Sequence, residues 1–393
     1  MYSLLASAVN HPDTIERYGG LFNHRILRSL AETGVDMNVV SPRPFAPPIG
    51  PYSAYSSLPD IENWGAYAVH HPRFWYLLPK RFFYGASGDS FAKRVPRYVN
   101  QTFDVPDVVH ACHVYLDGYG MLQYVREHDL PLFVVAHGTI LNSYEDFSGR
   151  VRRNVRETLD EATGVLCVSD ALAERARELT DPSTVSTVPL GADPERFPVD
   201  QRDTLRRELG VAEDATVVLF VGHFLERKGV REMIDVIPRI DDPDTVFVFV
   251  GHGGDLDDDL RRVLAAEGRS ARLVFNGLPP VALRRWFALA DVLWLPSHTE
   301  GRPTVIYEAM ASETAVLASS VGGVPEQVVD SETGLLVPPR DADELHRALQ
   351  SLIADPTRTR EMGAHGRERL VERGWTWAAH AERVRDHHLR AIE

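Results

Sequence analysis

The sequence has few of the features that would place it in an oxidising compartment or in a membrane. Its two cysteines, Cys112 and Cys167, lie in apolar runs. Two cysteines cannot build a disulfide framework, which favours a reducing compartment. No apolar run approaches the roughly 20 residues that a membrane-spanning helix needs. The opening MYSLLASAVNHP lacks a basic lead-in, so we interpret it as a first strand and not as a signal peptide. These absences predict a cytoplasmic protein.

Lysine is also scarce. Lys80, Lys93 and Lys228 are the only lysines, the other 39 of the 42 basic residues are arginine, and the net charge is −14. An acidic surface nearly free of lysine resembles proteins of salt-loving (halophilic) microbes, where high ionic strength screens self-repulsion. A GC-rich genome that favours arginine codons is the alternative explanation. Either way, an acidic chain lacks the basic footprint of a nucleic-acid binder.

The order of apolar segments predicts two domains. A chain of 393 residues is too long for one ordinary core. Short runs rich in Val, Leu, Ile and Phe alternate with longer amphipathic segments, which is typical of βα units around parallel sheets. We expect strands at 3–9, 36–42, 106–111, 132–138, 164–170 and 185–191, and then at 216–222, 246–253, 272–277, 291–297, 315–320 and 334–339.

A polar, proline-containing passage at 191–210 separates the halves. We therefore predict an α/β architecture with an N-terminal doubly wound domain at 1–192 and a C-terminal one at 193–375, facing each other across a cleft. A final helix at 376–393 should pack back on the first domain. Ligands of such sheets bind beyond the carboxyl ends of the strands. Residues 42–60 should form a long ordered loop or a mobile lid.

One candidate site lies in HTEGRPTVIYEAMA, residues 298–311. Pro303 suits the first turn of a helix, where its missing N–H costs nothing. The free N–H groups of Arg302, Thr304 and Val305 would then point outward at the positive end of the helix, which suits a phosphate. The guanidinium group of Arg302 could add a forked cationic donor.

Glu308 falls inside the apolar part of that helix. A buried carboxylate is costly unless something bonds it, and the two neighbouring hydroxyls of a ribose would do so. The alternative is an acidic residue on a solvated face. A ribose on Glu308 beside a phosphate at the helix end describes a nucleotide site in outline.

The second candidate segment is VLFVGHFLERKGV, residues 218–230, in which a strand runs into a glycine turn. Lys228 is the only lysine in the last 300 residues. A compact ammonium group suits a phosphate whose negative charge grows as a bond breaks. The alternative is a surface lysine that stands there by chance.

Together the two segments resemble the retaining glycosyltransferases of the GT-B fold, in the large family 4, and the match covers nearly the whole chain. That family carries a G-R-x-x-x-x-K-G segment that holds the donor diphosphate, matched here by Gly222, His223, Lys228 and Gly229. Weaker matches include YGGLFNH, VPLGADPERF and VGGVPEQVVDSETGLLVPP. The resemblance implies two Rossmann-like domains and transfer of a sugar from a nucleotide diphosphate sugar, UDP or GDP based, with retained anomeric configuration.

The family's E-x7-E motif is matched by Glu300 and Glu308. By resemblance, Glu300 contacts the donor sugar hydroxyls and Glu308 the ribose, with Gly301, Arg302 and Pro303 to Val305 beside the diphosphate. His223 stands where the family usually has arginine. A neighbouring diphosphate would favour its charged imidazolium form. Otherwise Arg302 or Arg227 supplies the charge, or the enzyme is impaired.

Two further features of the N-terminal half match the family. His137, in PLFVVAHGTILN, should lie at the carboxyl end of a strand, where the family often has a histidine that contacts the donor sugar. We group it with Lys228 and Glu300 as catalytic; a hydrogen-bonded structural histidine is the alternative. Gly19 and Gly20 resemble the family's glycine loop, although any tight turn would also explain them.

No metal site is predicted. HACH, residues 110–113, is expected in a strand whose side chains alternate faces, which splits the potential ligands. The pairs Asp242/Asp244 and Asp255/Asp257 mimic the D-x-D of metal-dependent glycosyltransferases, but an acidic composition alone produces such pairs.

RFWYLLPKRFFYG, residues 73–85, mixes aromatic and leucine side chains with cations. Such a segment suits a membrane interface or a lipid-linked acceptor, and a core segment with snorkelling ends suits it equally. The predicted enzyme is metal-independent and has a hydroxyl acceptor in a lipid-linked glycan, glycolipid or polysaccharide precursor, at the inner face of the membrane or free in the cytoplasm. The alternatives are a sugar-nucleotide epimerase or hydrolase on the same fold, or a non-catalytic sugar-binding protein.

Overall fold

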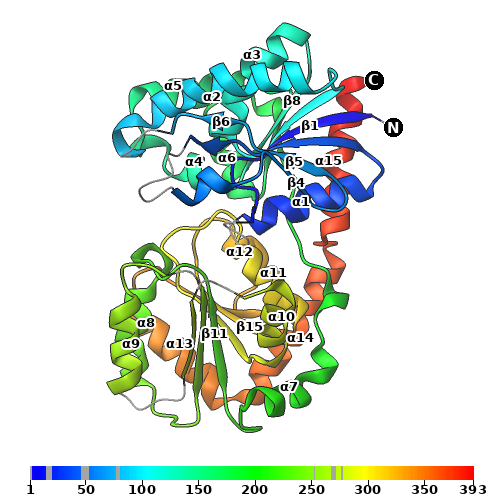
Figure 1. The fold of residues 1–393 in the computed structure, drawn as a ribbon. Helices are drawn as coiled ribbons and strands as arrows, with labels where there is room; N and C mark the ends of the chain where they lie inside the picture. Colours follow the sequence, from blue (N-terminus) through cyan, green and yellow to red (C-terminus); the bar gives the residue numbers. More distant parts are fainter. Residues whose placement is uncertain are drawn as a thin grey trace. The chain divides into compact units, whose positions relative to one another are not determined.

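The chain forms two compact units. The computed structural model describes residues 2–14, 20–45, 53–76, 80–251, 253–266, 271–275 and 278–393. Unit 1 comprises Met1–Pro189 and Trp377–Glu393, and unit 2 comprises Leu190–Thr376 (Figure 1). The chain thus leaves unit 1 after Pro189, where the sequence suggested 192, and returns to it at Trp377.

Unit 1 is built on an eight-stranded sheet in which only the pairing of β4 with β5 is antiparallel. The strand order is β10-β9-β8-β7-β1-β2-β5-β4, so β1 lies between β2 and β7, and Leu4 pairs with both Met37 and Val108. The strands are β1 (Ser3–Ser7), β2 (Asp36–Val40), β4 (Ile61–Asn63), β5 (Ala68–His70), β7 (Val108–Ala111), β8 (Leu132–Ala136), β9 (Gly164–Cys167) and β10 (Val185–Thr187). A separate two-stranded pair consists of β3 (Arg43–Pro44) and β6 (Arg73–Phe74).

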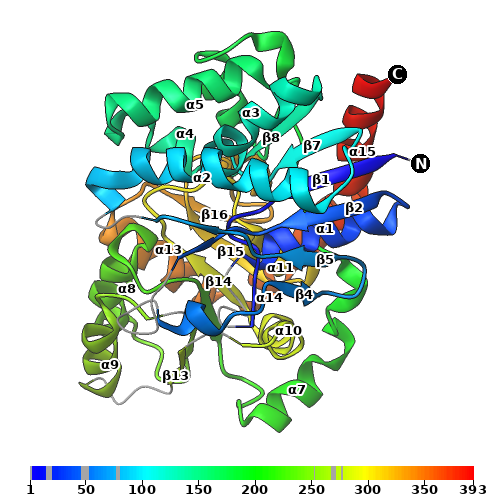
Figure 2. The same cartoon turned by 45° about the horizontal axis from the view of Figure 1, so that its top comes forward.

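The helices of unit 1 include one from the end of the chain. They are α1 (Leu21–Glu32), α2 (Lys80–Thr102), α3 (Tyr119–His128), α4 (Thr139–Asn142), α5 (Gly149–Glu161), α6 (Asp170–Arg177) and α15 (Trp377–Ile392). Figure 2 shows α15 next to β1, and the Nδ1 atom of its His388 lies 2.7 Å from the Tyr2 hydroxyl. Four short helical turns, at Ser53–Ser57, Val114–Gly118, Tyr144–Asp146 and Pro182–Thr184, complete the unit. The predicted return of the last helix to the first domain is therefore present.

Unit 2 has a six-stranded, fully parallel sheet in the order β13-β12-β11-β14-β15-β16. Counted within the unit this is 3-2-1-4-5-6, the Rossmann order, whose direction reverses between β11 and β14. The strands are β11 (Val217–Val221), β12 (Val246–Gly251), β13 (Ala271–Phe275), β14 (Val292–Leu295), β15 (Ala315–Ser319) and β16 (Gly334–Val337). A ligand of unit 2 is thus expected at the carboxyl ends of β11 and β14.

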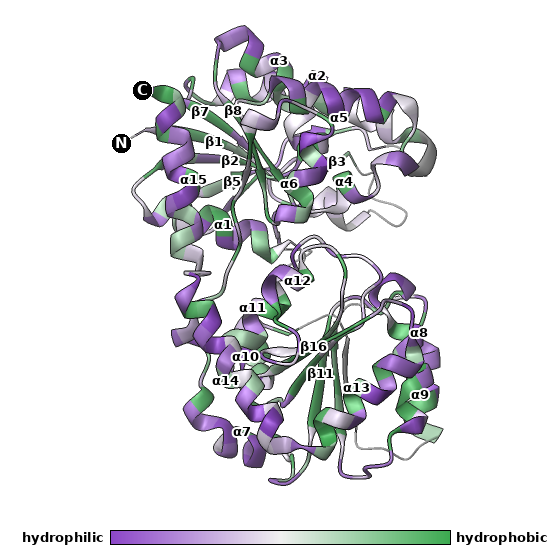
Figure 3. Ribbon diagram, turned by 180° about the vertical axis from the view of Figure 1, so that it is seen from behind, coloured by the Kyte–Doolittle hydropathy of each residue, from purple (hydrophilic) through white to green (hydrophobic). Residues whose placement is uncertain are grey.

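Helices cover both faces of the second sheet. α8 (Val230–Val236), α9 (Asp257–Ala266) and α13 (Ala342–Ala354) pack on one face, and α10 (Pro280–Leu289), α11 (Thr304–Ala311) and α14 (Pro356–Glu372) on the other (Figure 1). The remaining elements are α7 (Arg202–Leu209), α12 (Val324–Gln327) and short turns at Pro194–Arg196, Val199–Gln201, Glu226–Lys228 and Ile237–Arg239. Figure 3 shows hydrophobic strands inside hydrophilic helix surfaces.

Each of the twelve predicted strand segments overlaps a strand of the structure. The strands that the sequence did not predict are β3 to β6, which are two or three residues long and carry no hydrophobic run. β3 and the turn at Ser53–Ser57 lie in the segment expected to be a loop. Within the described ranges, no helix combines the length and the hydropathy that crossing a bilayer requires.

Buried histidines distinguish unit 1 and make its stability dependent on pH. His110 and His380 are at most 1% exposed. Burial lowers the pKa of His110 to about 3 and that of His380 to about 4, and it lowers the pKa of His388 well below its usual value. The fully buried histidines of the described ranges are His11, His71, His110, His380 and His388, all in unit 1.

We expect unit 1 to lose stability below about pH 6.5. Below this pH the histidines of the unfolded chain bind protons, whereas those of the folded unit bind them only near pH 4 to 3. Each such histidine therefore lowers the free energy of unfolding by about 1.4 kcal/mol per pH unit. Hydrogen exchange of each unit between pH 7 and 4.5, corrected for intrinsic rates, measures this. Earlier loss of protection in unit 2 would contradict it.

Candidate active site

A lysine and a glutamate meet where the strand order of unit 2 reverses. Lys228 ends the turn Glu226–Lys228 after β11, and Glu300 lies in the loop after β14. The Lys228 Nζ atom lies 2.6 Å from Glu300 Oε1, and the two side chains are 17% and 10% exposed. The structure thus brings together two residues that are 72 positions apart in the sequence.

The two loops that carry this pair are fastened to each other through their backbones. Gly229 adopts φ +74°, and a Cβ atom there would collide with the Pro296 carbonyl group. A side chain at this position would therefore push the loops apart. The His298 N–H group also donates a 2.9 Å hydrogen bond to the Arg227 carbonyl. These contacts fix the ammonium group of Lys228 beside the loop that carries Glu300.

The buried carboxylate of Glu308 lies in α11, which follows the same loop. The helix begins at Thr304, directly after Pro303, and Glu308 is only 5% exposed among buried neighbours such as Tyr307 and Met310. The prediction that Glu308 is buried is confirmed. The described part of the chain offers no acceptor for the backbone N–H groups of Thr304 and Val305. These groups form the positive end of α11.

Arg302 does not have the free guanidinium group that the sequence suggested. Its Nη1 atom lies 2.5 Å from Glu326 Oε2, its Nε atom donates to the Tyr307 hydroxyl, and the guanidinium group stacks 4.9 Å from the Trp375 ring centroid. With 6% exposure, this charge is already paired inside unit 2. The forked-donor interpretation therefore needs correction, because two of the three guanidinium nitrogens already bond protein groups.

The remaining predicted donor residues of unit 2 border the same loops. The N–H group of Gly222 donates to Val250 at 3.0 Å, and His223 after it is exposed. The Gly301 carbonyl accepts a 2.8 Å hydrogen bond from the N–H group of Gly323. Gly322, with φ +51°, packs against the Glu300 carbonyl. The glycine pair at 322 and 323 therefore supports the loop of Glu300 from behind.

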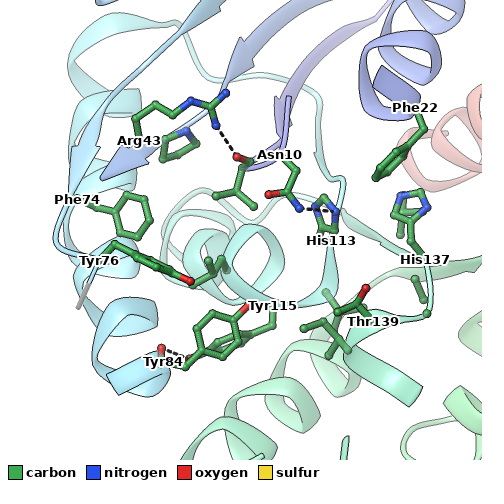
Figure 4. Close-up of a pocket in the computed structure, with 18 of the residues that line it drawn as sticks. Asn10, Phe22, Arg43, Phe74, Tyr76, Tyr84, His113, Tyr115, His137 and Thr139 are labelled. Carbon is green, nitrogen blue, oxygen red and sulfur yellow. Dashed lines mark hydrogen bonds between the residues drawn. The ribbon is translucent and has the colours of Figure 1, made fainter. Parts of the chain in front are cut away.

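In unit 1, His137 lies at the carboxyl end of β8 and lines a cavity of about 350 Å³ (Figure 4). Its ring centroid is 4.8 Å from that of Phe22 and 5.4 Å from that of His113. Burial holds the pKa of His137 well below its usual value, with smaller contributions from nearby histidines. The imidazole is therefore neutral. Gly20, with φ +67°, packs on the Asn10 carbonyl, whereas Gly19 lies outside the described residues.

Sequence reasoning did not find the pairing of a histidine of this cavity with a buried carboxylate. His113 Nδ1 lies 2.8 Å from Asp117 Oδ2, and Asp117 is fully buried. The spacing of HACH suggested only a metal motif, although its position at the carboxyl end of β7 is a signal for a ligand site. In the described ranges, no three histidine, cysteine, aspartate or glutamate side chains are grouped so that they could hold a metal ion.

The aromatic segment at 73–85 is divided between core and surface. Phe74 and Tyr84 are 1% and 8% exposed, whereas Trp75 and Phe83 are 46% and 43% exposed. Residues 77–79 of this segment lie outside the described ranges. The interpretation as a core segment therefore holds for part of it, and the membrane interpretation stays a prediction.

Comparison with known proteins gives a consistent result for both units. The family model "Glycosyl transferases group 1" matches residues 201–369, and "Glycosyltransferase Family 4" matches residues 20–196. The chain is 27% identical to TuaC of Bacillus subtilis, a glycosyltransferase assigned to teichuronic acid biosynthesis, over 86% of each chain.

Two solved structures share the fold over nearly their whole length. Sucrose-phosphate synthase from Thermosynechococcus elongatus has a TM-score of 0.81 and 22% identity, covering 99% of each chain. HepE of Anabaena, solved with UDP-glucose, has a TM-score of 0.73 and 20% identity, covering 98% of this chain and 99% of that one.

Proposed function

The chain belongs to the GT-B glycosyltransferases, and on this basis we propose that it moves a sugar from a nucleotide diphosphate sugar to an acceptor hydroxyl with retained anomeric configuration. The observation that carries the proposal is the 2.6 Å pair of Lys228 and Glu300 at the strand-order reversal of unit 2. The start of α11 and the buried Glu308 belong to the same loop and helix. Lys228 and the start of α11 suit a diphosphate, Glu300 suits a sugar, and Glu308 suits a ribose.

Each group has a defined task in this proposal. The bond between the sugar's anomeric carbon and the diphosphate oxygen breaks, and its electron pair leaves with the diphosphate. The acceptor oxygen bonds to the anomeric carbon, and the acceptor proton passes to the departing diphosphate. Lys228, His223 and the N–H groups of Thr304 and Val305 stabilise the charge that develops there. Because these donors are supplied by the chain, we propose a reaction that is independent of metal ions.

Glu300 has two successive partners in this scheme. Before the donor binds, its carboxylate neutralises Lys228 at 2.6 Å. When the diphosphate takes over the ammonium group, Glu300 Oε1 exchanges Lys228 for the sugar hydroxyls, from which it accepts hydrogen bonds. Glu308 accepts the two ribose hydroxyls. Within unit 1, we propose His137 as a neutral hydrogen-bonding group for a sugar.

We expect a UDP- or GDP-sugar as donor. HepE was solved with UDP-glucose, which supports a nucleotide sugar. A thermal-shift screen of UDP, GDP, ADP and their sugars in high salt should show one base that raises the melting temperature with concentration. A ligand at 100 times its Kd stabilises by about 2.7 kcal/mol. No stabilisation by any nucleotide would refute the proposal.

The alternative enzymes on this fold are separated by the need for an acceptor. An epimerase or hydrolase converts the nucleotide sugar alone, whereas a transferase releases nucleoside diphosphate at a rate that rises with acceptor concentration. A binding protein without chemistry releases none. Comparing release with and without a mixture of lipid-linked and soluble glycan acceptors distinguishes the three.

A basic and aromatic surface on unit 1 supports peripheral contact with the inner face of the membrane. Within an acidic chain, α2 carries five basic residues and one acidic residue. Its exposed Lys93, Arg94 and Arg97 line a groove with Trp75, and the Arg94 guanidinium group lies 5.9 Å from that ring. Cations around an exposed indole suit an anionic lipid surface, where a glycolipid or lipid-linked acceptor would reside.

Co-sedimentation with vesicles tests this contact. Replacing Lys93, Arg94 and Arg97 together by alanine should weaken binding to phosphatidylglycerol-containing vesicles by about a hundredfold, since each basic group near the surface contributes about 1 kcal/mol. Alanine at Arg262 and Arg347, exposed cations of unit 2, is the matched control. Equal binding to neutral phosphatidylcholine vesicles would contradict the electrostatic origin.

A further inference from the structure

One imidazole group links three loops at the carboxyl edge of the unit 2 sheet. His298 lies in the loop after β14, two positions before Glu300, and its side chain is 8% exposed. Its Nε2 atom lies 2.8 Å from Oε1 of Glu232, in the first turn of α8, the helix that follows β11. Its Nδ1 atom accepts a 3.3 Å hydrogen bond from Nε of Arg340, which follows β16. The loops after β11, β14 and β16 therefore meet at the side chain of His298.

The same histidine is also fixed through its backbone. The N–H group of His298 donates its 2.9 Å hydrogen bond to the Arg227 carbonyl, in the turn that ends with Lys228. His298 therefore bonds the segment of Lys228 through its main chain and the start of α8 through its side chain. α8 packs against α13, which begins two residues after Arg340 (Figure 1). The side-chain partners of His298 thus lie in or beside two packed helices.

Arg340 has a backbone conformation that is costly for a residue with a side chain. Its φ angle of +62° lies in the left-handed region, which favours glycine. Its side chain is exposed, and within the described ranges its guanidinium group has no carboxylate partner and bonds only His298. Non-glycine residues in such conformations cluster at functional sites. The contact with His298 is what an arginine contributes at this position.

Glu232 is bonded on one side of its carboxylate. The side chain is 13% exposed, and its Oε2 atom is buried without a hydrogen-bond partner in the described part of the chain. A carboxylate that is withdrawn from water and incompletely bonded lowers stability. Neither this glutamate nor the left-handed arginine is the residue that stability alone favours. Both of them contact the same histidine.

We propose that His298 is a positioning residue of the donor site, which together with Glu232 and Arg340 holds the loop of Glu300 so that its carboxylate meets the sugar of the nucleotide sugar. The proposal rests on the transferase function above. His298 does not contact the substrate and acts through Glu300. A misplacement of about 1 Å can lower a reaction rate about 10²-fold, so the position of this loop matters for transfer.

The groups assigned to the nucleotide have separate supports. Arg302, just before α11, bonds Glu326 and Tyr307, and Glu308 lies inside the helix itself. Loss of the His298 contacts should therefore displace the carboxylate of Glu300 and leave the start of α11 and Glu308 in place. The expected signature is weaker binding of the sugar part of the donor, with the nucleotide part little affected.

Binding to the full chain tests this signature. Isothermal titration calorimetry compares UDP with UDP-glucose, or the corresponding GDP or ADP pair if that pair gives the larger thermal shift. In His298→Leu the affinity for the nucleotide sugar should fall roughly tenfold, because hydrogen bonds to the charged Glu300 are lost. The affinity for the nucleoside diphosphate should change by no more than about twofold. Equal changes for both ligands, or no change, would overturn the proposal.

Two variants separate positioning from stability. Glycine adopts the φ angle of Arg340 without steric cost, so Arg340→Gly should keep or raise the melting temperature while it weakens binding of the nucleotide sugar. His298→Gln retains an amide N–H group for Glu232 and should recover part of the affinity that His298→Leu loses. A lower melting temperature in Arg340→Gly, with unchanged ligand preference, would show that these contacts serve only the fold.

A double variant tests whether His298 acts through Glu300. In the Glu300→Ala background no carboxylate remains to be positioned, so the addition of His298→Leu should change the preference for the nucleotide sugar by no more than about twofold. An effect as large as in the wild-type background would contradict the assignment.

The control is His346→Leu. His346 is a histidine of α13 in the same unit, and its Nε2 atom lies 2.9 Å from the carbonyl of Arg239, in the turn at the other end of α8. This variant should bind both ligands as the wild type does. If no nucleotide binds the wild-type protein, the proposed function fails. If nucleotides bind and His298→Leu behaves as His346→Leu does, only the inference fails.

Discussion

Replacement of Lys228 by alanine lowers the rate of sugar transfer by about 10²- to 10³-fold and changes nucleotide affinity far less. The ammonium group stabilises charge that develops on the departing diphosphate, so most of its effect belongs to the transition state, and one such group contributes about 3 to 4 kcal/mol. Steady-state kinetics with the donor identified by thermal shift measure kcat and KM separately.

Two further variants define what that result means. Lys228→Arg keeps the positive charge and should recover part of the rate, although the guanidinium group does not reproduce a compact ammonium. Arg262→Ala removes an exposed cation of α9 and should have wild-type kinetics. A Lys228→Ala enzyme whose KM rises while kcat is unchanged would show that Lys228 contributes only to ground-state binding.

The Glu308→Gln variant should bind the nucleotide about 10- to 100-fold more weakly. The substitution keeps the shape of the side chain but removes the charge that strengthens hydrogen bonds from the ribose hydroxyls, and hydrogen bonds to charged groups contribute about 1.5 to 3 kcal/mol. Isothermal titration calorimetry with the nucleoside diphosphate measures the affinity. Because an amide is less costly to bury than a carboxylate, the fold should tolerate the change.

The matched control for this variant is Glu361→Gln, an exposed glutamate of α14 in the same unit. Its nucleotide affinity should equal that of the wild type. If Glu308→Gln binds as tightly as this control, then the buried carboxylate has a structural role in unit 2 and does not contact the ribose.

Most of the fold was accessible from the sequence because both sheets are made of continuous apolar strands. Segments such as VVLFV in β11 and VLWL in β14 are buried on both faces, and each is bounded by polar or glycine-containing turns. β3 to β6 carry no such signal, because their short segments gain their pairing from neighbours in the fold and not from their own hydrophobicity. The sequence could not show them.

The candidate site could be predicted from the sequence where the position of a residue after a strand indicated its chemical role. A lone lysine after one strand and a glutamate after another were predicted to bind the same donor, because loops at one edge of a parallel sheet meet, and the structure places the two side chains 2.6 Å apart. Arg302 shows the limit of this reasoning. Its ion pair with Glu326, from the next βα unit, depends on a contact that spacing alone does not reveal.

The contact between His113 and Asp117 was not predicted, because HACH suggested only a metal site. The turn at Val114–Gly118 brings the two side chains together.

The most direct test of the central claim is a crystal structure with the nucleoside diphosphate that gives the largest thermal shift. We predict that its phosphates lie within hydrogen-bonding distance of Lys228 Nζ and of the N–H groups of Thr304 and Val305, that its ribose hydroxyls contact Glu308, and that Lys228 has left Glu300. Density for the nucleotide elsewhere, with the Lys228–Glu300 ion pair intact, would contradict the account.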